Sequence, residues 1–297
     1  MKNSVNIPNI ERIFLASARC PTLGKKKKDD FTLVRELSNR EYQEYSNARI
    51  RLVRFSNDQQ LFKIVFLNYN DYCNLLEQYK KEFMNNPSLN YSRMERMILN
   101  INKHILNYLS ATRTYLDHSE ANLKRHYGKD SQRVKRFKDA CSSAYDNHFS
   151  YRFLCGLRNY AQHCEMPIEG LVLSADHHLG NERYSLLATV DRDQLLKKHE
   201  WKSQLKKEIQ DLPPKFDISP HIDGMMKYLE RINLTLIEDD LPELMQNAEY
   251  VQQLIAHAKN MPGSPCILKI RESNVSFEWT PLHVVEMVIS YSNILKQ

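Results

Sequence analysis

The sequence predicts a mainly α-helical protein with two small β-hairpin additions. Its 297 residues include only seven glycines, with 42% hydrophobic and 26% charged residues, which is typical of a helical chain with a buried core. Apolar side chains recur every three or four residues over long stretches, as in a helix that buries one face. Alternating residues around turn signals at 169–190 and 266–280 predict the two hairpins.

The first 55 residues form an N-terminal segment whose fold the periodicity leaves open, apart from short strands. In ARIRLVRF, at 48–55, apolar and polar residues alternate, and this predicts a strand with Ile50 and Leu52 facing inward. FTLVREL, at 31–37, is a second short element.

Residues 56–170 are predicted to form the core of a helical bundle. A long helix begins near residue 56 and ends before Asn86-Pro87, because proline disfavours a helical conformation in the residue that precedes it. A second long helix runs to about Arg125, and a third, basic helix covers about 130–145. A fourth helix ends before Pro167.

The region 171–297 is predicted to hold a β-hairpin followed by helices that are candidates for completing the bundle. After the first hairpin, a linker leads into a helix with Pro220 in its first turn, where proline is tolerated. Helical periodicity continues to about Lys259 with an interruption at Pro242, and the second hairpin precedes a last helix over 281–295.

Basic residues are concentrated in the middle of a chain whose net charge is +6. Fifteen consecutive residues contain Lys124, Arg125, Lys129, Arg133, Lys135, Arg136 and Lys138. Clustered positive charge indicates a polyanionic partner, of which nucleic acid is the commonest. The alternative is the solvated face of a long helix.

Several function classes are not indicated by the sequence. No run of 18 apolar residues is present, and the N-terminus lacks the apolar stretch of a signal peptide, so we expect a cytoplasmic protein with no membrane partner. The six cysteines show no CxxC pair and no zinc-like grouping with histidine, so we expect reduced thiols and no metal site.

A polar helical face in FLCGLRNYAQHCEMP, at 153–167, holds the candidate functional residues. On a helical wheel, one arc of about 140° carries Arg152, Arg158, Asn159, Gln162 and His163. This face contains no carboxylate, whereas glutamate and lysine normally dominate a solvated helix face. Gly156 lies beside the arc, and a glycine in mid-helix indicates the close approach of another backbone or a ligand.

These residue types suit chemistry on a phosphodiester. Arg158 keeps its charge at all relevant pH values and is expected to hold the phosphate. Histidine is the residue type suited to proton transfer near neutral pH, and His163 is expected to take the proton from a ribose 2′-hydroxyl or deliver one to the leaving 5′-oxygen. Asn159 is expected to orient the imidazole or contact the phosphate. The further RNA or phosphate contacts predicted are Arg152, Gln162, Lys135 and Arg136.

The face offers no carboxylates for Mg²⁺, so no metal and no cofactor is expected. The alternative interpretation is an interface helix whose arginine and histidine side chains make ordinary hydrogen bonds.

LRNYAQH, at 157–163, resembles the motif of the HEPN superfamily, in which a histidine follows an arginine and usually a polar residue. Arg158, Asn159 and His163 match this motif, with four residues between the arginine and the histidine. The motif lies on a late helix after two long helices, as in bacterial HEPN-type proteins. The resemblance covers roughly residues 56–170 and implies a HEPN-like helical bundle.

The resemblance implies a metal-independent endoribonuclease that leaves 2′,3′-cyclic phosphate and 5′-hydroxyl ends. It also implies a homodimer in which two Arg/His faces meet in one cleft, with Gly156 allowing the partner helix to come near. Many members are toxins or antiviral defence effectors, so an antitoxin or regulatory partner is expected beside RNA. The alternative is a non-catalytic HEPN-like module that binds RNA or a protein.

Overall fold

The computed structural model describes residues 11–19, 31–88, 90–178, 181–271 and 274–295, apart from the side chains of 175–184. The chain divides into two compact units, one of residues 60–236 and the other of residues 1–59 together with 237–297. The first and last parts of the chain therefore belong to the same unit, which the periodicity of the sequence does not reveal.

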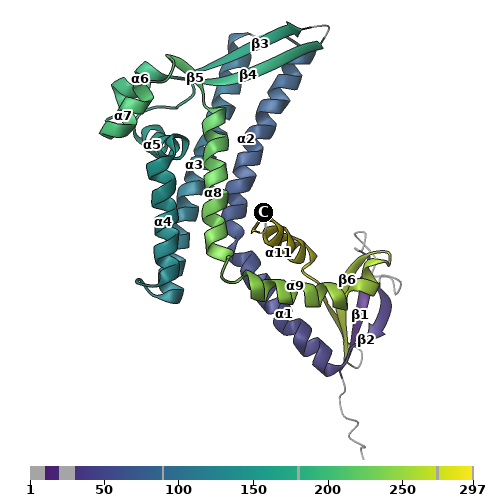
Figure 1. Cartoon of the computed structure of the whole chain (residues 1–297). Coiled ribbons are helices and arrows are strands. Elements are labelled where there is room, and N and C mark those ends of the chain that lie inside the picture. Colours follow the sequence, from purple (N-terminus) through teal and green to yellow (C-terminus); the bar gives the residue numbers. More distant parts are fainter. Residues whose placement is uncertain (1–10, 20–30, 89, 179–180, 272–273, 296–297) are drawn as a thin grey trace, which may run out of the picture. The chain divides into compact units, whose positions relative to one another are not determined.

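The 60–236 unit is built on long helices that are packed side by side (Figure 1). The helices are α2 (Gln60–Asn85), α3 (Tyr91–Tyr127), α4 (Gln132–Asn147), α5 (Phe149–His163) and α8 (Ser219–Ile237). Asn90 caps α3 by accepting a hydrogen bond from the Arg93 backbone N–H, and α3 ends at Gly128, which has a φ of 86°. The prediction of a mainly helical protein is confirmed.

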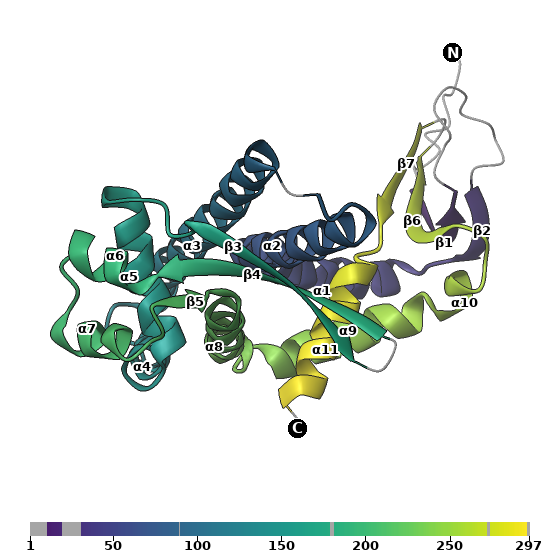
Figure 2. The same cartoon turned by 90° about the horizontal axis from the view of Figure 1, so that it is seen from above.

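A small antiparallel sheet lies at one end of these helices (Figures 1 and 2). Its strands are β3 (Gly170–His178), β4 (Asn181–Asp191) and β5 (Lys215–Asp217), in that order. The hairpin expected at 169–190 is β3 and β4, in which Gly170 pairs with Thr189. Two short helices that we did not predict, α6 (Arg192–Lys198) and α7 (Ser203–Gln210), lie between β4 and β5.

Large aromatic and aliphatic side chains fill the core of this unit. Tyr108, Phe153 and Leu154 are completely buried. Asn102 is also buried, at 4% exposure, and its amide bonds both backbone groups of Ile168: Nδ2 donates to the carbonyl at 2.9 Å and Oδ1 accepts from the N–H at 3.0 Å. This pair of bonds fixes the chain just before β3, where a proline has broken the helical pattern.

We predict that Asn102→Ala lowers the free energy of unfolding by about 2 to 4 kcal/mol, because two buried backbone groups of Ile168 lose their partner. Urea denaturation measures the change. Asn107→Ala, on an exposed position of the same helix, is the matched control and should cost far less. Equal losses in the two variants would show that the Asn102 bonds contribute little.

His221 is packed among aromatic side chains near the start of α8. Its ring lies edge-on to Phe149, Phe153 and Phe216, and Nδ1 is 3.1 Å from the Ser150 hydroxyl. Burial lowers the pKa of His221, and the negative charge of Asp217 opposes this only in part. The folded protein therefore favours the neutral imidazole.

We predict that the protein loses stability as the pH falls below about 6.5, the ordinary pKa of histidine, until the lowered folded pKa of His221 is passed. Over this interval the unfolded chain binds more protons than the folded one. His221→Gln should flatten the dependence, whereas His118→Gln, at an exposed position, should keep the wild-type slope. Part of the slope should persist through His104, whose pKa is also lowered by burial. Urea titrations between pH 7.5 and 5 test this, and an unchanged slope in His221→Gln would refute it.

Among its described residues, the other unit contains a four-stranded antiparallel sheet and four helices (Figure 1). The strands are β1 (Arg12–Ala18), β2 (Phe31–Glu36), β6 (Ser264–Arg271) and β7 (Asn274–Trp279), and their order in the sheet is β2-β1-β6-β7. The expected hairpin at 266–280 is β6 and β7. It extends the sheet because β6 pairs with β1, which comes from the first residues described. The helices are α1 (Asn39–Asp58), α9 (Leu241–Leu254), α10 (Ala256–Lys259) and α11 (Leu282–Leu295).

The strand predicted at 48–55 is wrong, because these residues belong to α1. The buried positions are Tyr45, Ala48, Leu52 and Phe55, which recur at helical spacing, while Ile50 is 58% exposed. The alternation was a coincidence produced by Arg49 and Arg51, which flank the exposed Ile50.

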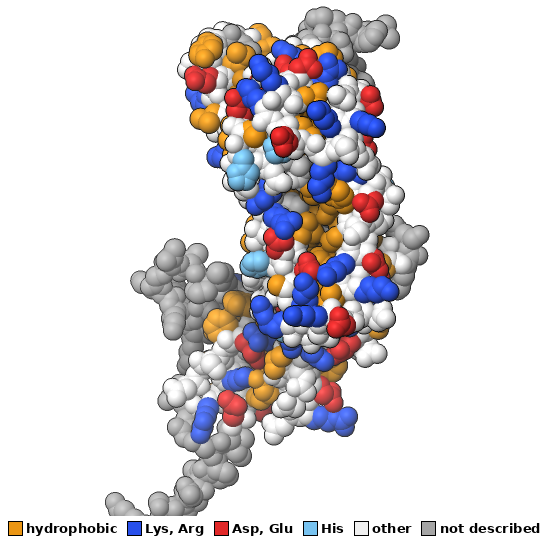
Figure 3. All heavy atoms as spheres, turned by 90° about the vertical axis from the view of Figure 1, so that its left-hand side faces the viewer, with side chains coloured by type: hydrophobic (Ala, Val, Ile, Leu, Met, Phe, Trp, Pro, Cys, Tyr) orange, Lys and Arg blue, Asp and Glu red, His pale blue; other side chains and the backbone are white. Residues whose placement is uncertain are grey.

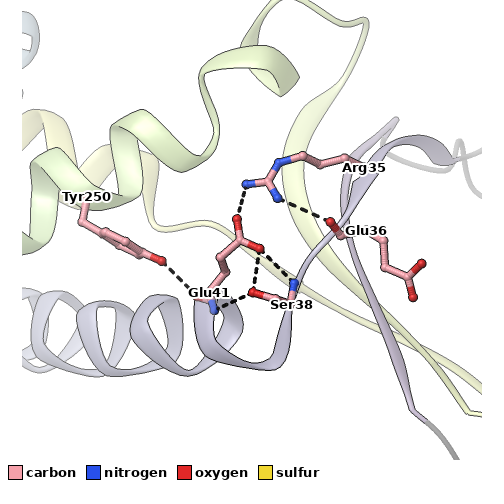
Figure 4. A network of polar contacts seen from close by, with 5 residues as sticks. All are labelled: Arg35, Glu36, Ser38, Glu41 and Tyr250. Carbon is pink, nitrogen blue, oxygen red and sulfur yellow. Dashed lines mark hydrogen bonds and ion pairs between the residues drawn. The ribbon is translucent and has the colours of Figure 1, made fainter.

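A network of polar contacts fixes the start of α1 (Figure 4). The Ser38 hydroxyl accepts from the Glu41 N–H and the Glu41 carboxylate accepts from the Ser38 N–H, which is a capping box. Arg35 pairs with this carboxylate at 2.8 Å, and the Tyr250 hydroxyl donates to the Glu41 carbonyl. Arg35 is the largest cause that lowers the pKa of Glu41 to about 2, followed by the bonds from Ser38. The S-x-x-E signature was visible in the sequence and indicates that a helix begins at residue 39, ahead of 48–55.

Candidate functional site

The candidate residues lie on α5, which is held from several sides within the 60–236 unit. It packs against α3, α4 and α7. The buried residues of α5 are Tyr151, Arg152, Phe153, Leu154, Leu157, Tyr160 and Ala161. Only Asn159, Gln162 and His163 of α5 are exposed, so the other side chains of the helix have well-defined surroundings.

Arg158 and Asn159 lie together at a pocket of about 550 Å³. Arg158 is partly buried and Asn159 is exposed, and Nη1 of the arginine donates to Oδ1 of the asparagine at 3.3 Å. The other walls come from α3, from Tyr145 of α4, and from residues 199–205. The pocket is the candidate site, and two of the three predicted catalytic residues meet there.

His163 is not among the described residues that line this pocket. It is the last residue of α5 and is exposed. It lies five positions after Arg158, which on a helix corresponds to about 7.5 Å along the axis and about 140° around it. Within one chain, the two side chains therefore leave α5 in different directions.

The other predicted phosphate contacts also lie outside the pocket. Gln162 and Lys135 are exposed, and Arg136 is partly buried on α4. Nearby basic residues are partly neutralised: Lys124 and Lys138 share Glu120, and the bond from Lys124 is the largest cause that lowers the pKa of this carboxyl. Lys and Arg side chains are nevertheless frequent on the face that carries α4 and α5, around an apolar hollow (Figure 3).

Arg152 is a structural residue in this chain rather than an open phosphate contact. Its side chain is 6% exposed, and its guanidinium forms a two-point ion pair with Glu208 of α7, with Nε 3.0 Å from Oε2. Its Nη1 donates to the backbone carbonyls of Tyr145 and Asp146 at the end of α4. The helical wheel of α5 shows no carboxylate, because the partner of Arg152 is Glu208, which lies on another helix 56 residues further along the chain.

Gly156 allows α7 to approach α5. A Cβ atom at this position would lie 2.9 Å from a ring carbon of Trp201 and 3.0 Å from a methyl group of Leu205. The expectation that Gly156 makes room for the helix of a second copy is therefore corrected. The close neighbour is a tryptophan of the same chain, which is 8% exposed and donates its indole N–H to the Leu195 carbonyl at 2.8 Å.

We predict that Gly156→Ala destabilises the protein by about 1 kcal/mol, because overpacking against Trp201 outweighs the better helix propensity of alanine. Differential scanning fluorimetry and urea unfolding measure the effect. In a Trp201→Phe background the ring carbon that clashes is gone and only the close contact with Leu205 remains, so the same substitution should cost clearly less. An equal loss in both backgrounds would place the cause elsewhere.

The pocket residues that the sequence analysis missed include four with polar or aromatic side chains, Arg113, His199, Trp201 and Lys202. Nδ1 of His199 lies 3.7 Å from Sγ of Cys164, and the imidazole ring is edge-on to Trp201. The segment 192–210, which supplies three of the four, carries no chemical motif. Only the density of charged and aromatic residues in this segment could have indicated that it contributes to a site.

The thiol that lines the pocket is not poised for nucleophilic attack. Burial raises the pKa of Cys155 to about 11, and the positive charges of Arg113 and Arg158 oppose this shift only in part. A thiol with this pKa is protonated at neutral pH. The pocket therefore offers cations, an amide and an imidazole rather than a thiolate.

The comparisons with known proteins give no relative. No family model, no curated protein and no solved structure matches the chain. Within the part of the chain that the structure describes, no three His, Cys, Asp or Glu side chains are grouped as metal ligands, and no helix has the length and apolarity to cross a bilayer.

Proposed function

We propose that the protein is a metal-independent endoribonuclease of HEPN type that acts on RNA as a homodimer. Arg158 holds the scissile phosphate and stabilises the charge that develops on it. His163 transfers a proton at the ribose 2′-oxygen or the leaving 5′-oxygen, and Asn159 positions the arginine or contacts the phosphate. The products are 2′,3′-cyclic phosphate and 5′-hydroxyl ends.

The observation that carries this proposal is the pairing of Arg158 and Asn159 at the edge of a pocket. The hydrogen bond between them orients the guanidinium. The second support is the exposed position of His163 on the same helix, where the imidazole is accessible to a polyanion. The resemblance of LRNYAQH to the HEPN motif supplies the reaction type.

A second copy of the chain is part of the proposal because Arg158 and His163 diverge on α5. In a two-fold dimer the arginine of one protomer acts with the histidine of its partner across the cleft. We propose a cytoplasmic toxin or phage-defence effector controlled by an antitoxin or another regulatory partner, in line with the same resemblance.

A non-catalytic RNA-binding module is the second candidate. It is favoured by one observation, the position of His163 outside the pocket that holds Arg158 and Asn159. Such a module would use Lys135, Arg136 and the pocket to bind RNA, with an affinity that falls steeply as salt is added. It would leave the RNA intact.

We predict that the purified protein cleaves RNA in the presence of EDTA, and that Arg158→Ala and His163→Ala each lower the rate about a hundredfold or more. Gel analysis of the products, with end-group assays for the cyclic phosphate, measures cleavage. His118→Ala, an exposed histidine on α3, should retain wild-type activity. If wild type cleaves no faster than the Arg158→Ala, His163→Ala double variant, the enzyme proposal is wrong.

Mixing the two inactive single variants tests the shared cleft within the same assay. A mixed dimer contains one site with an intact arginine and an intact histidine from different protomers. Partial recovery of activity is therefore expected. No recovery from subunits that demonstrably exchange would contradict a site shared between protomers.

A further inference from the structure

The pocket beside Arg158 has an apolar floor that a phosphate group alone does not need. Leu109, Leu154, Leu205 and Met225 line it and are at most 3% exposed. Its volume of about 550 Å³ falls within the usual range of small-molecule sites, roughly 300 to 1,000 Å³. The floor therefore suits a flat, largely apolar group of substantial size.

The lining of the same pocket carries a surplus of positive charge. Arg113, Arg158 and Lys202 contribute three cations, and Glu200 is the one carboxylate among the described lining residues. Arg113 is paired with the exposed Asp117 at 2.8 Å, and the Lys202 ammonium lies 5.3 Å from the centre of the Tyr145 ring. These interactions are at the surface and leave an environment that attracts an anion.

Two polar atoms in the pocket wall are buried without a hydrogen-bond partner. They are Nε of Arg158 and Oγ1 of Thr112, a residue that is 2% exposed. The Tyr108 hydroxyl lies near Thr112, but the two make no hydrogen bond of normal geometry. Buried polar groups are nearly always paired in proteins, so an unpaired donor and an unpaired hydroxyl in a pocket indicate a missing ligand.

We propose that this pocket binds one nucleotide of an RNA chain. The phosphate lies at Arg158 with Arg113 and Lys202 around it, and the base lies over the apolar floor with its polar edge toward the Thr112 hydroxyl. This inference rests on the proposed function, because it places the base next to the phosphate that Arg158 holds. It adds a base-binding subsite, through which the identity of one nucleotide affects binding.

A nucleotide explains the three features together. An inorganic anion would use the cations and leave the apolar floor and Thr112 without a contact. An apolar ligand would fill the floor and leave the cations and the buried donor unpaired. A base attached to a phosphate has the apolar ring faces, the polar ring edge and the negative charge that the pocket offers.

Trp201 provides a direct readout of the pocket. It is one of two tryptophans, and the other, Trp279, belongs to the other unit and can be replaced by phenylalanine. The Trp279→Phe protein is titrated with AMP, GMP, CMP, UMP, ribose 5-phosphate and inorganic phosphate while the fluorescence is recorded. At least one nucleotide should bind about tenfold more tightly than ribose 5-phosphate and phosphate, because only the nucleotides carry a base. No such preference would overturn the proposal.

Matched variants locate the binding. Thr112→Val and Lys202→Ala should each weaken nucleotide binding by about fivefold, as expected for one lost polar interaction. Thr114→Val and Lys207→Ala are the controls. Thr114 lies on α3, as Thr112 does, and Lys207 lies on α7, which begins just after Lys202. Both control residues are exposed and neither lines the pocket. Thr114 bonds the Ser110 carbonyl within its own helix. Equal losses in the controls and the pocket variants would overturn the assignment.

The source of the nucleotide is tested by competition. A single-stranded RNA oligonucleotide should displace the bound mononucleotide, whereas failure to displace it would assign the pocket to free nucleotides and overturn the inference. If mononucleotides bind and RNA competes with them, but no RNA is cleaved in EDTA, the pocket proposal is supported and the ribonuclease proposal is refuted. Cleavage by a protein that shows no base-dependent binding would refute the pocket and leave the ribonuclease standing.

Discussion

The packing of α7 against α5 is the interaction on which the candidate site depends. Gly156 leaves room for Trp201, and the ion pair between Arg152 and Glu208 ties the same two helices together. Trp201 also stacks with Phe153 and Tyr160 of α5. The segment before α7 is thereby positioned over the open side of α5, where it forms the wall of the pocket. Loss of this packing would remove the wall and leave Arg158 on an ordinary helix surface.

The two arginines of α5, Arg152 and Arg158, have different surroundings. Arg152 is buried, and its guanidinium is engaged by Glu208 and by the carbonyls that end α4, so its charge is compensated inside the protein. Arg158, two turns further along, has a single described bond, to Asn159, and its Nε has no partner. Two residues of the same type on one helix thus differ in function because their neighbours differ. The neighbour of Arg152 is distant in sequence and the neighbour of Arg158 is adjacent.

The long helices of the 60–236 unit and the two hairpins could be predicted from the sequence, because both depend on local periodicity and turn residues. The two long helices begin and end within a few residues of the expected positions. The strand at 48–55 failed because a pattern of period two was read over eight residues, although the capping signature at Ser38 and Glu41 indicated a helix. At the candidate site, Arg158 and Asn159 were predicted from the polar face of the helix and from the motif. Trp201, Lys202 and Glu208 were not, since their proximity to α5 arises from tertiary packing that no local pattern records.

The division of the chain has a consequence for its synthesis. Residues 60–236 are contiguous, so every described residue of the pocket has been made once the ribosome has completed α8, which contains Met225. The other unit can complete its sheet only later in synthesis, because its strand β1 pairs with β6, which begins at Ser264. Domains tend to fold as they emerge, and pairing between distant segments comes late. A chain interrupted between these two points would therefore contain the complete pocket, while β1 would have β2 beside it and would still lack β6 on its other side.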